Sequence, residues 1–118
     1  MPTSSPGSFP PGSVVVVPFP YSDRLAEKRR PALVVSGPDV EKAGFVWISM
    51  ITSARNPAMR GDLPISDLGS AGLGVASKVR PLKLACIEPS RVLRRIGAVD
   101  SAEADIVYET LRGLIGPL

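Results

Sequence analysis

The sequence predicts a single domain of mainly β structure, a small antiparallel β-barrel with one C-terminal helix packed on it. Three observations support this prediction. Short apolar and β-branched runs recur along the chain, few connections between them are long enough for a crossover helix, and only the C-terminal segment has the apolar spacing of a helix. The length of 118 residues fits one domain with its own core. No internal repeat or second domain is apparent.

The first half of the chain contains three expected strands, at residues 14–17, 31–36 and 44–51. The first is a run of four valines, which favours a strand over a helix. Pro18 and Pro20 end it, because neither can donate a ladder hydrogen bond. A polar, charged loop is expected over residues 21–29. Pro31 then opens the second strand and holds Arg30 in extended geometry.

The elements expected next are shorter. They are a turn at 37–39, a loop at 55–61, a short edge strand at 62–65, a flexible connection at 67–74, an extended segment at 75–87, one helical turn at 89–93 and a last strand at 95–99. Pro81 interrupts the extended segment, which indicates an edge position or a bulge rather than an unbroken central strand.

The C-terminal helix has recognisable signals at both ends. Asp100 or Ser101 caps its start, and Glu103 stands at capping-box spacing from Asp100. Gly116 and Pro117 end it. Its apolar residues fall on one face at helical spacing and are expected to pack on the sheet. They are Ile106, Val107, Leu111, Leu114 and Ile115.

Composition sets the domain boundary and the expected compartment. Residues 1–11 are rich in Pro, Ser and Gly and are expected to form a disordered N-terminal tail, which leaves residues 12–118 as the folded domain. No apolar run is long enough to span a membrane and no signal peptide is visible, so a cytoplasmic location is expected. The single cysteine, Cys86, lies in an apolar run and is expected in the core.

The charge pattern permits a nucleic-acid partner without requiring one. The net charge is +3 and the calculated pI is about 9.4. The segment at 78–95 is mainly basic, whereas the segment at 100–109 is mainly acidic. The chain contains no histidine, which is the commonest general base, and no Cys/His cluster for zinc. Phosphate-loop and dinucleotide motifs are also missing, so no metal or cofactor is expected.

Three polar positions stand out as a candidate phosphate site. Arg30 precedes the second expected strand, Thr52 follows the third, and Arg80 lies beside Pro81. Sequential strands are usually neighbours, so the polar ends of the second and third strands are expected to meet on one rim. Two guanidinium groups and a hydroxyl offer several donors to phosphate oxygens. The alternative for each residue alone is an ordinary solvated charge or a strand-end threonine.

If the ligand is a phosphodiester, such donors suit metal-free RNA cleavage. In that reaction the 2′-hydroxyl attacks the adjacent phosphorus, and preorganised donors stabilise the charge that develops on its oxygens. A base is also needed, and free arginine is a poor one. Asp23 and Glu27 are the loop carboxylates nearest to Arg30 in sequence. Either one can serve as the base, and the sequence does not choose between them.

Several motifs occur in a fixed order along the chain. They are the run 14–23 (VVVVPFPYSD), the run 28–36 (KRRPALVVS), Ile51-Thr52-Ser53, the run 77–84 (SKVRPLKL), the run 87–90 (IEPS) and Arg95-Ile96-Gly97. In this order they resemble the MazF/PemK family of toxins from bacterial type II toxin–antitoxin pairs. The resemblance covers residues 12–115, nearly the whole chain.

The resemblance implies an SH3-like barrel of the MazF/PemK/CcdB type that works as a homodimer. It implies a metal-independent, sequence-specific endoribonuclease (an mRNA interferase) that cleaves single-stranded RNA to a 2′,3′-cyclic phosphate and a 5′-hydroxyl. It also implies a cognate antitoxin with a disordered tail. Arg30 and Thr52 match the catalytic arginine and threonine of the family. The residues expected to contact RNA or phosphate are Lys28, Arg29, Ser53, Arg80 and Lys83.

Arg80 matches a third catalytic arginine of one branch of the family, but this chain departs from that branch. Leu82 stands where the branch has an acidic residue, and the histidine of its first loop is missing. An alternative is therefore a non-catalytic SH3-like binding module, similar to gyrase poisons or to an inactive toxin that binds only antitoxin or nucleic acid. A weaker alternative is a barrel that binds nucleic acid nonspecifically through its basic segment.

Overall fold

The computed structural model of the chain describes residues 8–19 and 28–117. Its strands are β1 (Ser13–Phe19), β2 (Lys28–Val34), β3 (Val46–Ser53), β4 (Leu63–Pro64), β5 (Ser77–Ile87) and β6 (Arg94–Ala98). Its helices are α1 (Pro38–Lys42), α2 (Leu68–Ala71), the 3₁₀ turn η1 (Pro89–Arg91) and α3 (Ser101–Leu114). The strands form one six-stranded sheet in the order β4-β5-β3-β2-β1-β6. Each pairing between these strands is antiparallel.

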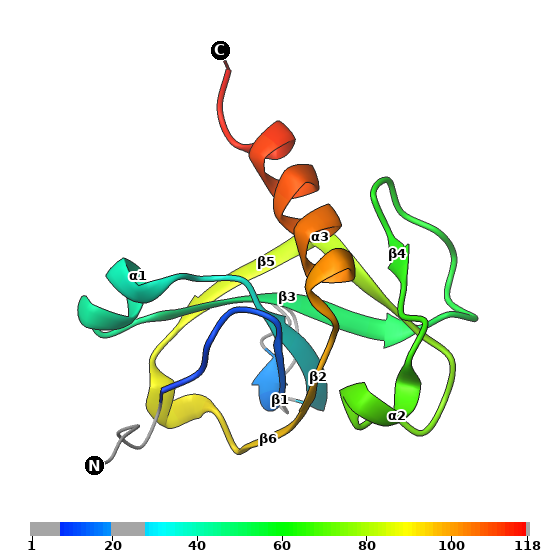
Figure 1. The fold of residues 1–118 in the computed structure, drawn as a ribbon, viewed down its shortest axis with the longest axis horizontal. Coiled ribbons are helices and arrows are strands. Elements are labelled where there is room, and N and C mark those ends of the chain that lie inside the picture. The colour runs from blue at the N-terminus through cyan, green and yellow to red at the C-terminus, as the bar shows by residue number, and fades with distance from the viewer. Residues whose placement is uncertain (1–7, 20–27, 118) are drawn as a thin grey trace.

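The sheet curls into a half-barrel, and α3 lies across it (Figure 1). This confirms the predicted mainly β fold with a C-terminal helix. No helix in the described part of the chain is long and apolar enough to cross a membrane. The predicted tail at 1–11 is described only from residue 8 onward. There Phe9 packs against buried residues of the sheet.

Apolar side chains are buried on both faces of the sheet, which explains the unbroken valine run of β1. One core cluster includes Val14 and Leu33 together with Val107 of α3. The other, on the opposite face, includes Val15 and Val17. Successive residues of a strand point to opposite faces. A strand that is covered on both sides therefore needs apolar residues at every position.

β2 begins earlier than predicted. Lys28, Arg29 and Arg30 were expected at the end of a loop, but they pair with residues of β1. Pro31 pairs with Val16, whose carbonyl oxygen accepts from the Leu93 N–H on its other side. The Val16–Pro31 pair is therefore a non-hydrogen-bonded one, and the missing N–H of Pro31 leaves no gap in the ladder.

β5 contains the predicted irregularity at Pro81. Its pairing with β3 jumps from Ser49–Leu84 to Met50–Arg80, so residues 81–83 bulge out of the ladder. The Ser49 hydroxyl donates to the Arg80 carbonyl oxygen at 2.9 Å and secures the backbone beside the bulge. The bulge prediction is confirmed. β4 pairs with β5 only at Lys78 and Val79, so among the described residues Pro81 has a strand neighbour on the β3 side alone, as at a sheet edge.

Two short helices replace segments that were predicted as turn or loop. α1 begins at Pro38, a residue whose fixed φ suits a first helical turn. α2 is capped by Asp67, whose carboxylate accepts from the Ser70 N–H at 3.0 Å. Gly72 ends α2 in the left-handed conformation. Both helices are about one turn long, which is too short to show the apolar periodicity by which a helix is recognised in a sequence. Their capping residues define them instead.

α3 begins as predicted, since the Asp100 carboxylate accepts from the Glu103 N–H at 2.8 Å. The Glu103 side chain instead accepts from the Ser66 N–H at 2.9 Å and ties α3 to the segment after β4. The prediction of one buried apolar face is only partly right. Val107 and Leu111 are buried with Ala104. Ile106, Leu114 and Ile115 are exposed.

Cys86 is exposed, so its predicted core position is wrong. It pairs with Trp47 across β3 and β5. A groove of about 310 Å³ separates this end of the sheet from the last turn of α3. Trp47, Leu84 and Ile115 line it. Leu84 and Cys86 therefore face the surface, whereas Ala85 and Ile87 pack against the core cluster that contains Val15 and Val17.

Gly97 of β6 offers a test of how closely β6 and α2 approach. A methyl group at this position would overlap Ser70 O and lie 2.5 Å from the Ala71 carbonyl carbon. We expect Gly97→Ala to lower the free energy of unfolding by about 3 kcal/mol. Gly113→Ala in α3 is the control, since nothing lies within 4 Å of the added carbon. That variant should gain up to about 1 kcal/mol. Equal effects in urea unfolding would contradict the close approach.

Candidate functional site

Arg30 and Thr52 lie on the same face of neighbouring strands. The β2–β3 ladder ends at the pair Ala32–Met50. Arg30 comes two residues before Ala32 and Thr52 two residues after Met50, so strand alternation places both side chains on one face of the sheet. Thr52 pairs directly with Lys78 on its other side. The structure therefore places Arg30 and Thr52 on one face of neighbouring strands, and it adds Lys78 to the same face. The predicted contact of Arg30 and Thr52 with one phosphate stays a prediction.

A second row lies one step along the same face. Met50 pairs with Arg80. The β4–β5 ladder pairs Leu63 with Val79, so its next position places Asp62 opposite Arg80. All of these side chains leave the sheet on the side of the cluster that contains Ala32 and Met50. We call Arg30, Thr52, Lys78, Arg80 and Asp62 the polar rows.

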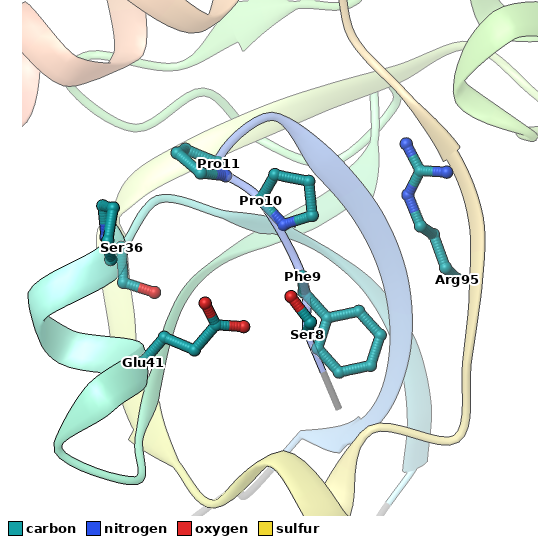
Figure 2. A pocket seen from close by; sticks show the side chains of 9 residues that line it. Ser8, Phe9, Pro10, Pro11, Ser36, Glu41 and Arg95 are labelled. Carbon is teal, nitrogen blue, oxygen red and sulfur yellow. The ribbon is translucent and has the colours of Figure 1, made fainter. Parts of the chain in front are cut away.

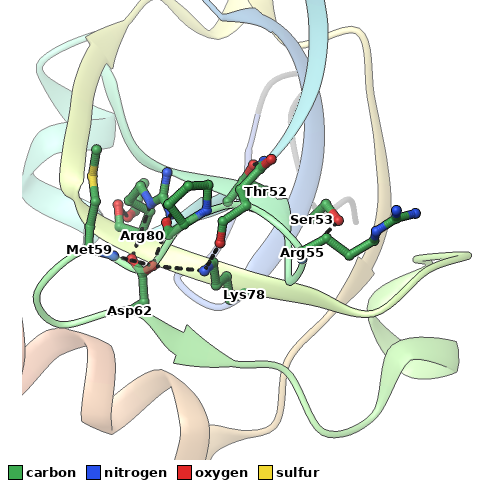
Figure 3. Close-up of polar contacts among 10 residues, drawn as sticks. Thr52, Ser53, Arg55, Met59, Asp62, Lys78 and Arg80 are labelled. Atoms are coloured by element: carbon green, nitrogen blue, oxygen red, sulfur yellow. Dashed lines mark hydrogen bonds and ion pairs between the residues drawn. The ribbon is translucent and has the colours of Figure 1, made fainter.

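Asp62 neutralises two buried cations. Its Oδ2 lies 3.0 Å from Arg80 Nη2 and 3.3 Å from Lys78 Nζ, and the three side chains are 8–9% exposed. Arg80 Nε also donates to Asp62 Oδ1 at 3.2 Å, which makes this pair bidentate. Figure 3 shows Lys78 and Arg80 converging on this carboxylate.

The pKa of Asp62 reflects two opposing effects. Burial alone would raise this pKa, because it penalises the charged form. Hydrogen bonds from Arg80, from the Met59 N–H and from Lys78 outweigh it and lower the pKa from 3.8 to about 2. The carboxylate is therefore ionised at neutral pH, as its two cationic partners require.

The loop between β3 and β4 is fastened onto the polar rows. Lys78 Nζ donates to the Asn56 carbonyl oxygen at 2.7 Å, and Arg80 Nη2 donates to that of Pro57 at 2.7 Å. Asn56 Nδ2 in turn donates to Thr52 Oγ1 at 2.6 Å. Thr52 is only 4% exposed. Its hydroxyl is therefore shielded from water, and hydrogen bonds to charged groups are stronger there than in water.

The other predicted contact residues are spread over the surface. Arg29 is exposed and, by strand alternation, points to the face opposite Arg30. Lys28 is exposed on the Arg30 face, and Lys83 is exposed within the β5 bulge. Ser53 points away from the polar rows, and its hydroxyl oxygen accepts from the Arg55 N–H at 3.2 Å. The candidate bases Asp23 and Glu27 lie outside the described residues.

Sequence reasoning missed Lys78, Asp62 and Asn56. A signal for Lys78 was present, because Lys78 and Arg80 alternate with Val79 and must share one face of a strand. Two cations on a covered face require a nearby carboxylate. Asn56 has no such signal, because its role depends on how the loop folds.

The described residues hold no group of three or more His, Cys, Asp or Glu that suits a metal ion. A cavity of about 480 Å³ lies between the N-terminal segment and α1, with Glu41 and Arg95 on opposite sides (Figure 2). None of the residues predicted for the site lines it.

Removal of the Asp62 charge should destabilise the protein. Asp62→Asn leaves Lys78 and Arg80 buried without a counter-charge, so we expect a loss of about 3 kcal/mol in the free energy of unfolding. The control is Glu109→Gln, because the ion pair of Glu109 with Arg112 is mostly exposed. That change should cost less than about 1 kcal/mol. Equal losses in urea unfolding would show that Asp62 has no special structural role.

Low pH should lower the free energy of unfolding through protonation of the Asp62 carboxyl. Between pH 4 and pH 2 the unfolded Asp62 carboxyl binds a proton that the folded one does not, so stability falls as the pH falls. The shift corresponds to about 2 kcal/mol. Urea unfolding across this range should show the loss in the wild type and a smaller slope in Asp62→Asn. An identical slope in both proteins would assign the pH dependence to other groups.

Comparisons with known proteins agree with this architecture. Among solved structures, MazF (form I) from Deinococcus radiodurans has a TM-score of 0.73 at 22% identity, covering 92% of this chain and 96% of that chain. An endoribonuclease in complex with its cognate antitoxin, from a mycobacterial species, has a TM-score of 0.67 at 16% identity, with coverage of 93% and 100%. Mycobacterium tuberculosis toxin MazF-mt6 has a TM-score of 0.66 at 19% identity, with coverage of 86% and 93%. At these identities the likeness shows the fold.

The sequence itself identifies the family. No curated protein gives a significant match to the chain. A family model described as the PemK-like, MazF-like toxin of type II toxin–antitoxin systems matches residues 10–115. This confirms the resemblance noted from the motifs. Since the match spans nearly the whole chain, the protein belongs to the PemK-like, MazF-like family of type II toxin–antitoxin toxins.

Proposed function

We propose that the chain is the toxin of a type II toxin–antitoxin pair and acts as a metal-independent endoribonuclease on single-stranded mRNA. The observation that carries this proposal is that Arg30 and Thr52 lie on one face of the sheet, on the hydrogen-bonded neighbours β2 and β3. Neighbouring strands are about 5 Å apart. We propose that both side chains contact one phosphate group. Family membership gives the same function class independently.

In the proposed reaction, the 2′-oxygen of one nucleotide attacks the adjacent phosphorus and loses its proton to a base. The bond from phosphorus to the 5′-oxygen of the next nucleotide breaks, and that oxygen takes up a proton. The products are a 2′,3′-cyclic phosphate and a 5′-hydroxyl. Arg30 and Thr52 donate to the nonbridging oxygens, whose charge grows in the transition state. Asp23 and Glu27 remain the candidates for the base.

The remaining basic residues divide into two proposed roles. Lys28, Arg29 and Lys83 are exposed and suit contacts with the RNA backbone. Arg80 was expected to contact phosphate, but two of its nitrogens already donate to Asp62 and Pro57. The geometry supports a positioning role for Arg80, which holds the β3–β4 loop against the sheet.

Protein partners are part of the proposal. The groove lined by Trp47, Leu84 and Ile115 exposes large apolar side chains, each at least 42% accessible. Exposed apolar patches of this kind often mark protein interfaces. A related structure was solved in complex with its cognate antitoxin. We propose that this chain likewise binds an antitoxin with a disordered tail and forms a homodimer, and that it acts in the cytoplasm, where mRNA is available.

The test is cleavage of a long single-stranded RNA by purified protein in excess EDTA. Arg30→Ala should lower the cleavage rate at least about 100-fold, because it removes a donor to the developing charge. Arg29→Ala is the matched control, since it removes the same charge from the neighbouring position on the opposite face. It should change the rate only a few-fold, through weaker binding of RNA.

Either of two results would count against the proposal. Similar losses in both arginine variants would indicate a general charge effect in place of a specific site. Absence of cleavage by the folded, antitoxin-free wild type would favour the non-catalytic binding module.

A further inference from the structure

We propose that Asn56 is a positioning residue that orients the hydroxyl proton of Thr52 toward the RNA phosphate. The inference rests on the proposed function and goes beyond it, since Asn56 belongs to none of the motifs that indicated the site. It concerns a single hydrogen bond, in which Asn56 Nδ2 donates to Thr52 Oγ1 at 2.6 Å.

Asn56 is fixed in place through its backbone. Its N–H donates to the Ser53 carbonyl oxygen at 3.1 Å, which closes a tight turn directly after β3. Its own carbonyl oxygen accepts from Lys78 Nζ at 2.7 Å. Lys78 is held in turn by Asp62 at 3.3 Å. The Asn56 amide therefore approaches Thr52 from a rigid backbone and not from a freely moving loop.

The direction of the hydrogen bond determines what Thr52 can do. A hydroxyl has one proton to donate and two lone pairs that accept. The Asn56 amide occupies one lone pair, so it cannot take the proton, which stays available for another acceptor. A hydroxyl that accepts one hydrogen bond is also a better donor in the next one. Thr52 is thus prepared to donate to an anionic phosphate oxygen.

The contacts of Lys78 and Arg80 explain why Asn56, and not one of these cations, donates to the Thr52 hydroxyl. Lys78 is the residue that pairs with Thr52 on β5, but its ammonium group is directed to Asn56 O and Asp62. Arg80 is likewise directed to Pro57 O and Asp62. The charged groups support the loop, and the Asn56 amide of the loop is the donor that reaches the Thr52 hydroxyl.

The first experiment separates kcat from KM for RNA cleavage. Asn56→Ala should lower kcat roughly tenfold, because a rotating hydroxyl loses much of its donor role in the transition state. KM should change little, since Asn56 need not touch RNA. Met59→Ala is the control in the same loop: its side chain is partly exposed, and its hydrogen bonds with Asp62 are made by its backbone N–H and carbonyl oxygen. A change confined to KM, or an unchanged kcat, would overturn the proposal.

A double-mutant cycle tests whether Asn56 acts through Thr52. Thr52→Ala removes the hydroxyl that Asn56 is proposed to orient. In that background, Asn56→Ala should have almost no further effect on kcat. A further tenfold loss would show that Asn56 acts independently and would overturn the proposal. Thermal unfolding of all four proteins checks that each is folded in the assay.

The Asn56→Asp variant tests the role of Asn56 through the pH dependence of the cleavage rate, which a purely structural role would not change. The ionised carboxylate accepts a hydrogen bond from the Thr52 hydroxyl, so this hydroxyl no longer donates to the phosphate. The protonated carboxyl can donate to Thr52 as the amide does. The rate relative to wild type should therefore be lowest near pH 7 and rise as the pH falls toward about 4. Lys78, Arg80 and Arg30 lie on the same face and favour the ionised form, while Asp62 opposes it. A ratio that does not change with pH would overturn the assignment.

The two proposals fail in different ways. If the wild type does not cleave RNA, both fall. If the wild type cleaves and Thr52→Ala is impaired while Asn56→Ala is not, only the role of Asn56 is lost.

Discussion

The carboxylate of Asp62 is the interaction on which the rest of the site depends. It lies between two cations from β5 that are almost completely covered, and a buried charge without a partner is strongly unfavourable. With Asp62 in place, the spare donors of Lys78 and Arg80 turn to carbonyl oxygens of the β3–β4 loop. Asp62 thus allows Lys78 and Arg80 to be buried, and these two residues then hold the β3–β4 loop in contact with Thr52.

Strand alternation then determines which basic residues can work together. Arg29 and Arg30 are adjacent in sequence, yet they belong to opposite faces of β2. Arg30 shares its face with Thr52, Lys78 and Arg80, which come from two other strands. A basic run that looks uniform in the sequence therefore separates into one residue of the polar rows and a neighbour that is exposed on the opposite face of β2.

The apolar groove also shows that a sequence pattern alone does not determine whether a residue is buried. Trp47, Leu84 and Ile115 look like core residues in a sequence, because apolar residues in strands and helices usually are buried. In the fold they line an open groove, since the last turn of α3 does not close against β3 and β5. A partner that covers this groove would bury them, which is consistent with a family whose members work in pairs with an antitoxin.

The sequence by itself determined the mainly β class, the C-terminal helix with its Asp100 cap, the bulge at Pro81 and the position of Arg30 and Thr52 on neighbouring strands. These depend on local rules, namely β-branched runs, caps, the missing N–H of proline and the adjacency of sequential strands. The tertiary structure alone decided that Asp62 would meet Lys78 and Arg80, that Asn56 would reach Thr52, and that Cys86 would be exposed. Each of these depends on which distant segments pack together, and strand register and loop closure are set by the whole sheet and not by neighbours in the chain.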